Sequence, residues 1–218
     1  MKYKGIIFDF DGTLVNTIED LTDSLNCALK VLQQKQVTLD EGKRLIGKGL
    51  RNFIKDALPK TLREDAVYVD QATDLLKSEY QKRYIAKTKP YPGIEGLLAT
   101  LKKEGIPFGI NTNKPTDAAK YITENLFNIE DFVGIYGFSN AYPRKPDPSC
   151  ALRLAEEMMI KPSECLYIGD SLVDYQTARN AKMDVLMCEW GFGDEKDLLN
   201  LKETQCIKTP QEILERLK

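Results

Sequence analysis

The chain of 218 residues contains no histidine. Its absence excludes hydrolases in which a histidine base activates a serine or cysteine, and it excludes metal sites built on imidazole. Acid–base chemistry near neutral pH must therefore come from carboxylate, lysine, tyrosine or cysteine side chains with altered pKa values.

Cysteines are few and widely spaced. There are five, an odd number, and no two of them form a C-x-x-C pair. This pattern does not predict a disulfide framework or a zinc site, so we expect buried free thiols in a reducing compartment.

Long apolar runs and blocks of one charge are also missing. No apolar stretch reaches the roughly 18 residues that would span a bilayer, and the N-terminal residues lack the apolar region of a signal peptide. Lys and Arg total 31 and Asp and Glu total 33, a formal net charge of −2. These features argue against a nucleic-acid or membrane partner. We expect a cytoplasmic protein.

Short apolar runs alternate with helical patterns along most of the chain. Compact runs of this kind are typical of buried parallel strands. Strand–helix alternation predicts right-handed βαβ units, and hence an α/β fold with a doubly wound, Rossmann-like parallel sheet. The predicted strands are Tyr3–Phe8, Pro107–Asn111, Phe132–Tyr136, Cys165–Ile168, Val185–Cys188 and a short edge strand Cys206–Lys208.

One stretch breaks the alternation. Residues 17–87 contain helical patterns and no convincing strand. We therefore predict a helical domain inserted after the first strand, with 1–16 and 88–218 forming the sheet domain. Two apolar stripes support the prediction: Ile18, Leu21, Leu25, Ala28, Leu29 and Leu32, and Val69, Ala72, Leu76, Tyr80 and Tyr84.

Polar side chains gather where the predicted strands end. Ligands of open parallel sheets bind beyond the carboxyl ends of the strands, so these side chains are expected to meet. Each of them alone is more often a helix cap or a solvated surface residue. Their joint order is what makes the pattern specific: Asp9 and Asp11 after the first strand, Thr112 after the second, Lys145 before a helix, and Asp170 and Asp174 after a later strand.

Four carboxylates brought together would repel one another and raise at least one pKa. A hard divalent cation with oxygen ligands relieves this repulsion, and Mg²⁺ suits such a site. The predicted metal residues are Asp9, Asp11, Asp170 and Asp174, with Lys145 adding a positive charge.

A site of this kind fits phosphoryl transfer. An ionised Asp9 needs no base to act as nucleophile. Asp11, two residues on, is placed to protonate the leaving oxygen and then to activate water. Gly12 permits close approach of the backbone to a phosphate, and Thr112 and Asn113 are candidates to hold its remaining oxygens.

The motifs resemble those of the haloacid dehalogenase-like superfamily. The segment Asp9–Thr17 (DFDGTLVNT) is similar to its first signature, Thr112 to the second, Lys145 to the third and Gly169–Asp174 (GDSLVD) to the fourth. The resemblance implies a Rossmann-like core with a helical cap. It also implies that Asp9 is the nucleophile and Asp11 the acid/base. Asp9, the Asp11 carbonyl and Asp170 would bind Mg²⁺, with Asp174 supporting the metal through its second shell or a bound water.

Within the superfamily the chain resembles the phosphoglycolate phosphatases. The supporting segments are Arg44–Leu50, Tyr91–Gly93, Thr112–Pro115 and Glu189–Gly193. This resemblance implies a small phosphorylated metabolite as substrate, phosphoglycolate being favoured. Lys48 and Arg51 in the cap would then meet its far anionic end. A monomer or a homodimer is expected.

Other functions share most of these residues. A pyrophosphatase or a nucleotide or sugar phosphatase would keep the same core. A mutase similar to β-phosphoglucomutase would keep both Asp9 and Asp11, although that family usually carries a cap histidine. A phosphate-binding module without catalysis is the alternative from a different class, but Asp9, Asp11, Lys145 and Asp170 are all intact.

Overall fold

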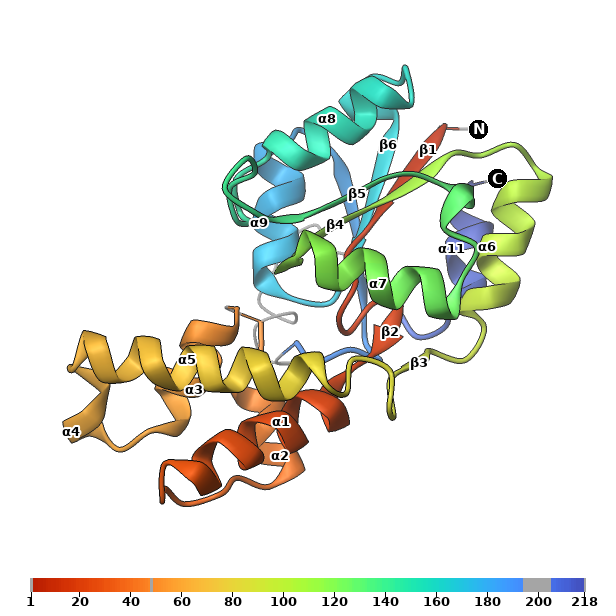
Figure 1. Cartoon of the computed structure of the whole chain (residues 1–218). Helices are drawn as coiled ribbons and strands as arrows, with labels where there is room; N and C mark the ends of the chain where they lie inside the picture. The colour runs from red at the N-terminus through yellow and green to blue at the C-terminus, as the bar shows by residue number, and fades with distance from the viewer. Residues whose placement is uncertain (1, 48, 194–204, 218) are drawn as a thin grey trace. The chain divides into compact units, whose positions relative to one another are not determined.

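The computed structural model describes residues 2–47, 49–193 and 205–217 (Figure 1). The chain forms two compact units. One contains residues 1–16 and 90–218 and is called the sheet unit; the other contains 17–89 and is called the helical unit. The strands β2 (Val15–Asn16) and β3 (Lys89–Pro90), where the chain passes between the units, pair with each other.

The sheet unit is built on six parallel strands in the order β5-β4-β1-β6-β7-β8. The central strand β1 pairs with β4 on one side and β6 on the other, so that Ile7 lies opposite Gly109 and Tyr167. The strands are β1 (Gly5–Phe8), β4 (Phe108–Pro115), β5 (Phe132–Phe138), β6 (Cys165–Gly169), β7 (Asp184–Cys188) and β8 (Gln205–Ile207).

Helices cover both faces of this sheet, so the predicted fold class is confirmed. Neighbouring residues of a strand point to opposite faces. Ile7 and Tyr167 join the apolar cluster formed with α8 and α9, whereas Phe8 packs edge-on against Phe108. Figure 1 shows α6, α7 and α11 on the other side of the sheet from α8 and α9. The helices are α6 (Ile94–Lys103), α7 (Thr116–Leu126), α8 (Ser149–Glu157), α9 (Leu172–Asn180) and α11 (Gln211–Leu217).

Strand β4 continues further than the sequence predicts. The expected strand ended at Asn111, but β4 runs to Pro115, which pairs with Phe138 of β5. The register between β4 and β5 shifts between Asn111 and Pro115. Irregular pairing of this kind changes the direction in which side chains at the end of a strand point. It places Thr112 and its neighbours on the sheet itself.

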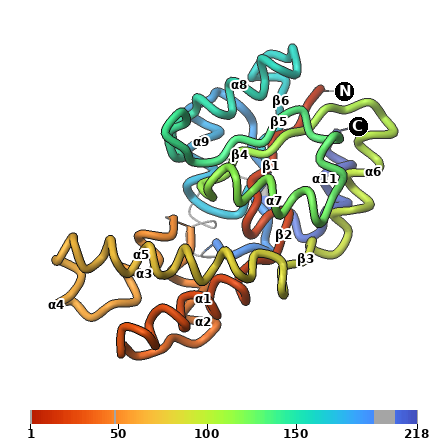
Figure 2. The backbone as a smooth tube through the Cα atoms, viewed as in Figure 1, coloured from red at the N-terminus to blue at the C-terminus, as the bar shows by residue number. Residues whose placement is uncertain are grey.

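The described residues of the helical unit form helices joined by turns and irregular loops, and its last residue begins β3. The two predicted apolar stripes are buried, mainly between α1 and α5, except that Leu32 and Tyr84 at their ends are half-buried, and Tyr80 is among the largest fully buried side chains. Its helices, traced in Figure 2, are α1 (Ile18–Val31), α2 (Leu39–Leu45), α3 (Leu50–Ala57), α4 (Lys60–Arg63) and α5 (Ala66–Gln81).

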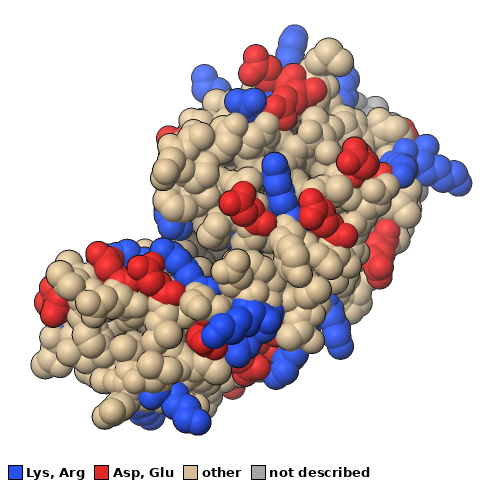
Figure 3. All heavy atoms as spheres, viewed as in Figure 1, with Lys and Arg blue, Asp and Glu red and all other residues tan. Residues whose placement is uncertain are grey.

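All five cysteines are free, as predicted. No helix among the described residues is long and apolar enough to cross a membrane. On the face drawn in Figure 3, cationic and anionic side chains are interspersed. This mixture agrees with the nearly balanced charge of the sequence.

A buried carboxylate joins the two ends of the helical unit. Asp20 on α1 is 1% exposed and accepts hydrogen bonds from the backbone N–H groups of Lys87 and Thr88 and from the Thr88 hydroxyl, the shortest at 2.8 Å. Hydrogen bonds to an ionised carboxylate are strong. If the carboxylate is removed, donors that remain buried cannot form replacement hydrogen bonds with water.

We expect Asp20→Ala to lower the free energy of unfolding by about 2–3 kcal/mol, because several hydrogen-bond donors lose their acceptor. Asp23→Ala is the matched control on the same helix. Asp23 forms an exposed ion pair with Lys87, so its loss is expected to cost less than about 1 kcal/mol. Urea unfolding followed by circular dichroism measures both. Equal costs for the two variants would contradict the role given to Asp20.

Candidate active site

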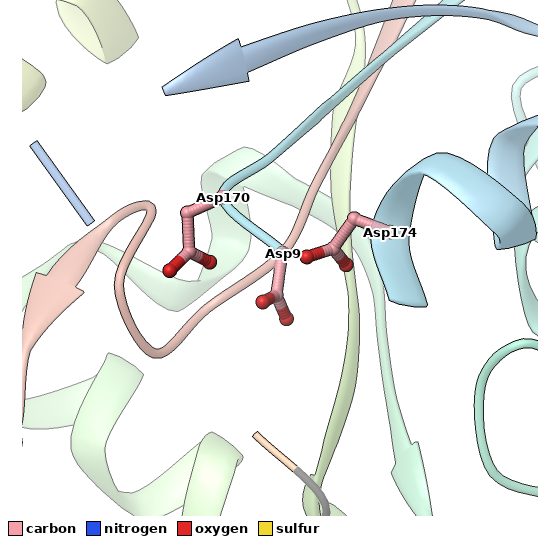
Figure 4. Close-up of side chains that lie close together, drawn as sticks. All are labelled: Asp9, Asp170 and Asp174. Atoms are coloured by element: carbon pink, nitrogen blue, oxygen red, sulfur yellow. The ribbon is translucent and has the colours of Figure 1, made fainter. Parts of the chain in front are cut away.

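Three aspartates meet at the carboxyl edge of the sheet (Figure 4). Asp9 directly follows β1, and its N–H still donates to Ile168 O at 2.8 Å. Asp170 directly follows β6, and Asp174 lies in the first turn of α9. All three are buried, and each offers a carboxylate oxygen within 4.8 Å of the others.

The turn after Asp9 fits closely over Asp170. Phe10 O accepts hydrogen bonds from three successive N–H groups, those of residues 13 to 15, which turns the chain sharply. Gly12 within this turn has φ +90°, a conformation that side chains disfavour, and a Cβ there would lie 2.3 Å from Oδ2 of Asp170. Glycine is therefore required at position 12 by both backbone conformation and space.

Lys145 supplies a positive charge inside this cluster. Its Nζ lies 2.6 Å from Oδ1 of Asp9 and 2.6 Å from Oδ1 of Asp174. Asn113 on β4 holds the backbone of Lys145: its Oδ1 accepts from Lys145 N at 2.8 Å, and its Nδ2 donates to Lys145 O at 3.4 Å. One ammonium thus faces three carboxylates.

Hydrogen bonds fix the other two carboxylates. Oδ2 of Asp174 accepts from the backbone N–H and the hydroxyl of Ser171, at 3.0 and 2.6 Å. Oδ2 of Asp170 accepts from the N–H of Phe192 at 2.6 Å, and its Oδ1 accepts from the Thr13 hydroxyl at 3.3 Å. Such contacts lock the carboxylates in position before any ligand arrives.

The environment shifts the pKa values of these groups. Burial, and next the charge of Asp174, raise the pKa of Asp9 to about 7 although Lys145 opposes the shift. Burial and the charges of Asp174 and Asp9 raise the pKa of Asp170 well above its usual range. Burial alone would lower the pKa of Lys145, but Asp174 and Asp9 together hold it well above its usual value.

The donor set fits a hard divalent cation. It consists of buried carboxylate oxygens only, and the excess negative charge around Lys145 is what a cation would neutralise. Oδ1 of Asp9 accepts no well-directed hydrogen bond from any described group, although the Lys145 ammonium lies beside it. Among the described residues no histidine or thiolate joins this cluster, which disfavours zinc.

The carboxylate of Asp11 lies outside the three-aspartate cluster. Its Oδ2 is 3.0 Å from Nζ of Lys114, a buried lysine at the end of β4. Thr112 is also buried, and its hydroxyl accepts a hydrogen bond from Lys114 N at 3.2 Å. The structure therefore brings Asp9, Asp170 and Asp174 together, whereas Asp11 meets a second lysine.

The two predicted cap residues belong to the helical unit. Lys48 lies outside the described residues. Arg51 lies on α3 in the helical unit, where its Nε donates to Oδ1 of Asp70 at 2.7 Å. Contact of either residue with a substrate stays a prediction.

Four contributors to the site were not predicted: the Thr13 hydroxyl, Lys114, Ser171 and the backbone N–H of Phe192. Ser171 precedes Asp174 by three residues, which is the spacing of a capping box, so the hydrogen bonds between these two residues could have been predicted from the sequence. Lys114 carried a weaker signal, its place two residues after Thr112. The Phe192 N–H carried none, because it reaches Asp170 only through the tertiary fold.

Comparison with known proteins identifies the family to which this chain belongs. The sequence profile of the haloacid dehalogenase-like hydrolases matches residues 6–188. The chain belongs to this family. The predicted superfamily is thereby confirmed.

Relatives within the family carry a common name. A phosphoglycolate phosphatase of Psychrobacter arcticus is 30% identical over 212 aligned positions, and the match covers 95% of this chain and 92% of the relative. One of Rhodospirillum rubrum is 32% identical over 206 aligned positions, and the match covers 88% of this chain and 82% of the relative. The predicted resemblance to phosphoglycolate phosphatases is confirmed by these matches.

A solved structure agrees along the whole length of the chain. A Lactobacillus delbrueckii subsp. bulgaricus protein, itself only predicted to be a phosphoglycolate phosphatase, has a TM-score of 0.93 at 29% identity. The match covers 100% of this chain and 99% of that protein. The fold of this haloacid dehalogenase-like hydrolase is therefore that of its family.

The raised pKa of Asp9 predicts how pH changes the stability of the metal-free protein. The folded state binds this proton more tightly than the unfolded state, whose pKa is near 3.8. The contribution of this proton to the free energy of unfolding is fully present below about pH 4 and is lost as pH rises through about 7.

Asp9→Asn removes this titration. In excess chelator, we expect the stability of Asp9→Asn relative to wild type to increase by roughly 1–3 kcal/mol between pH 5 and pH 8. Urea unfolding at several pH values measures the difference, in which the titrations of groups that do not interact with Asp9 cancel. A difference that stays constant with pH would contradict the electrostatics described for the cluster.

Proposed function

We propose that this hydrolase is a Mg²⁺-dependent phosphatase that cleaves a small phosphate monoester through an aspartyl-phosphate on Asp9. The observation that carries the proposal is the setting of Asp9. Its carboxylate is buried at the carboxyl edge of the sheet, beside the Lys145 ammonium and two further aspartates. A fixed, poorly solvated carboxylate of this kind is suited to nucleophilic attack on phosphorus.

In the first step, a carboxylate oxygen of Asp9 attacks phosphorus and forms an O–P bond. The bond between phosphorus and the substrate's bridging oxygen breaks, and that oxygen takes a proton from Asp11. The alcohol then leaves. Lys145 would balance charge on the transferred group, with the hydroxyl of Thr112 as a further contact, while Asn113 would act indirectly by holding the backbone of Lys145.

In the second step, Asp11 accepts a proton from water while the water oxygen attacks phosphorus. The O–P bond to Asp9 breaks, which releases inorganic phosphate and restores the Asp9 carboxylate. Asp11 thus returns to its protonated state, and the cycle is balanced. Asp11 serves first as acid and then as base because the leaving oxygen of the first step and the water oxygen of the second step occupy the same position beside it.

Asp9 and Asp170 would hold the magnesium ion, with the carbonyl of Asp11 as a further ligand and Asp174 supporting the site through hydrogen bonds. When bound, the ion supplies positive charge that offsets the repulsion between a phosphate dianion and the carboxylates. The all-oxygen donor set and its excess negative charge support this assignment.

For the substrate we propose phosphoglycolate, on the strength of the relatives' names. We further propose that the helical unit is the cap that selects it, with Lys48 and Arg51 toward the anionic end of the substrate. A pyrophosphatase, a nucleotide or sugar phosphatase, or a mutase would share the core residues. Phosphate release from a panel of substrates separates the hydrolases among these, and a mutase would release little phosphate from any member of the panel.

We expect phosphate release in Mg²⁺ from phosphoglycolate in preference to sugar phosphates, nucleoside monophosphates and pyrophosphate. Excess chelator should reduce the rate at least about 100-fold, since the metal stabilises transferred charge, and added Mg²⁺ should restore it. Preference for another compound would overturn the substrate assignment and keep the mechanism. Undiminished turnover in chelator would overturn the metal assignment.

A further inference from the structure

A second buried lysine serves the site beside Lys145. Lys114 has only 3% of its side chain exposed, and its Nζ lies 3.0 Å from Oδ2 of Asp11, whose side chain is 19% exposed. An ammonium group is costly to bury without an anionic partner. The position of Lys114 is therefore coupled to the position of the Asp11 carboxylate.

The backbone of Lys114 is rigid. Its N–H donates to the hydroxyl of Thr112, and Pro115 follows it in paired contact with β5. Gly137 on β5 lies so close that a Cβ there would be 2.3 Å from Lys114 O. Lys114 therefore extends from a fixed point on the sheet, whereas Asp11 sits on the turn between β1 and β2.

The two lysines contact different aspartates. Nζ of Lys145 lies against Asp9 and Asp174, and Nζ of Lys114 lies against Asp11. Under the proposed function, Lys145 thus accompanies the nucleophile and Lys114 accompanies the acid/base. A carboxylate that must meet the leaving oxygen within hydrogen-bond reach benefits from a rigid partner that restricts its rotamers.

We propose that Lys114 is a positioning residue that orients the Asp11 carboxylate toward the leaving-group oxygen. This inference rests on the proposed function. A purely structural ion pair, which only ties the turn to β4, is the competing explanation. The two differ in one consequence: only a positioning role makes the effect of removing Lys114 depend on the leaving group.

The experiment compares an alkyl and an aryl phosphate. Phosphoglycolate loses a poor leaving group that needs a proton, whereas p-nitrophenyl phosphate loses a stable anion that needs little help. Lys114→Met keeps the length and apolar stem of the side chain. Rates of first-step release, of glycolate and of the nitrophenolate burst, are measured by rapid quench, because the second step also uses Asp11.

We expect Lys114→Met to slow glycolate release by about 30- to 1000-fold and the nitrophenolate burst by less than about 5-fold. Asp11→Asn should show the same selectivity, and the double variant should be no slower than Asp11→Asn within about 3-fold, since both changes remove one function. Lys120→Met on the exposed face of α7 is the control, with both rates expected at wild-type level.

Equal slowing of both substrates, or effects that multiply in the double variant, would overturn the positioning role. Unchanged glycolate release would do so too. Lys114→Gln serves as a second variant if Lys114→Met is unstable, and the nitrophenolate burst itself reports an intact nucleophile. A wild-type enzyme inactive on both esters would instead overturn the proposed function, and the inference with it.

Discussion

The contact on which the site depends is the ammonium of Lys145 between Asp9 and Asp174. Three carboxylates buried at one sheet edge repel one another, and one lysine 2.6 Å from two of them offsets part of that repulsion. The remaining negative charge disfavours a phosphate and favours a divalent cation. Folding thus prepares a cluster with excess negative charge that is suited to hold a cation, and the pKa of Asp9 is raised by its burial and, next, by the charge of Asp174.

The fold assembles this cluster from distant parts of the chain. Parallel strands end at one edge, so residues that follow β1 and β6 and residues in the last part of β4 meet there without long loops. Asn113 then fastens the backbone of Lys145 to β4, and Gly12 lets the turn after β1 approach Asp170 closely. Each of these features restricts one side chain. Together they give a preorganised site, which is what charge stabilisation in phosphoryl transfer requires.

Much of this arrangement could be predicted from the sequence, because compact apolar runs identify the strands and strand ends converge by topology. The rest depends on tertiary contacts. Leu152 and Met159 are apolar yet exposed, since Met159 lies just beyond the end of α8 with φ +58° and Leu154 takes the inner face. Asn113, predicted to hold substrate, uses both amide atoms on the backbone of Lys145. No periodic pattern indicates that Lys114 would meet Asp11 across the sheet.

The most direct test of the central claim is to trap the phosphoenzyme. Wild type and Asp11→Asn are mixed with ³²P-labelled p-nitrophenyl phosphate in Mg²⁺, since its first step needs little help from Asp11, then quenched in acid within milliseconds, digested and mapped by mass spectrometry. We expect label on the peptide containing Asp9, in greater yield for Asp11→Asn because its second step is impaired, and none for Asp9→Asn. Turnover without label on Asp9, or equal labelling of Asp9→Asn, would contradict Asp9 as the nucleophile.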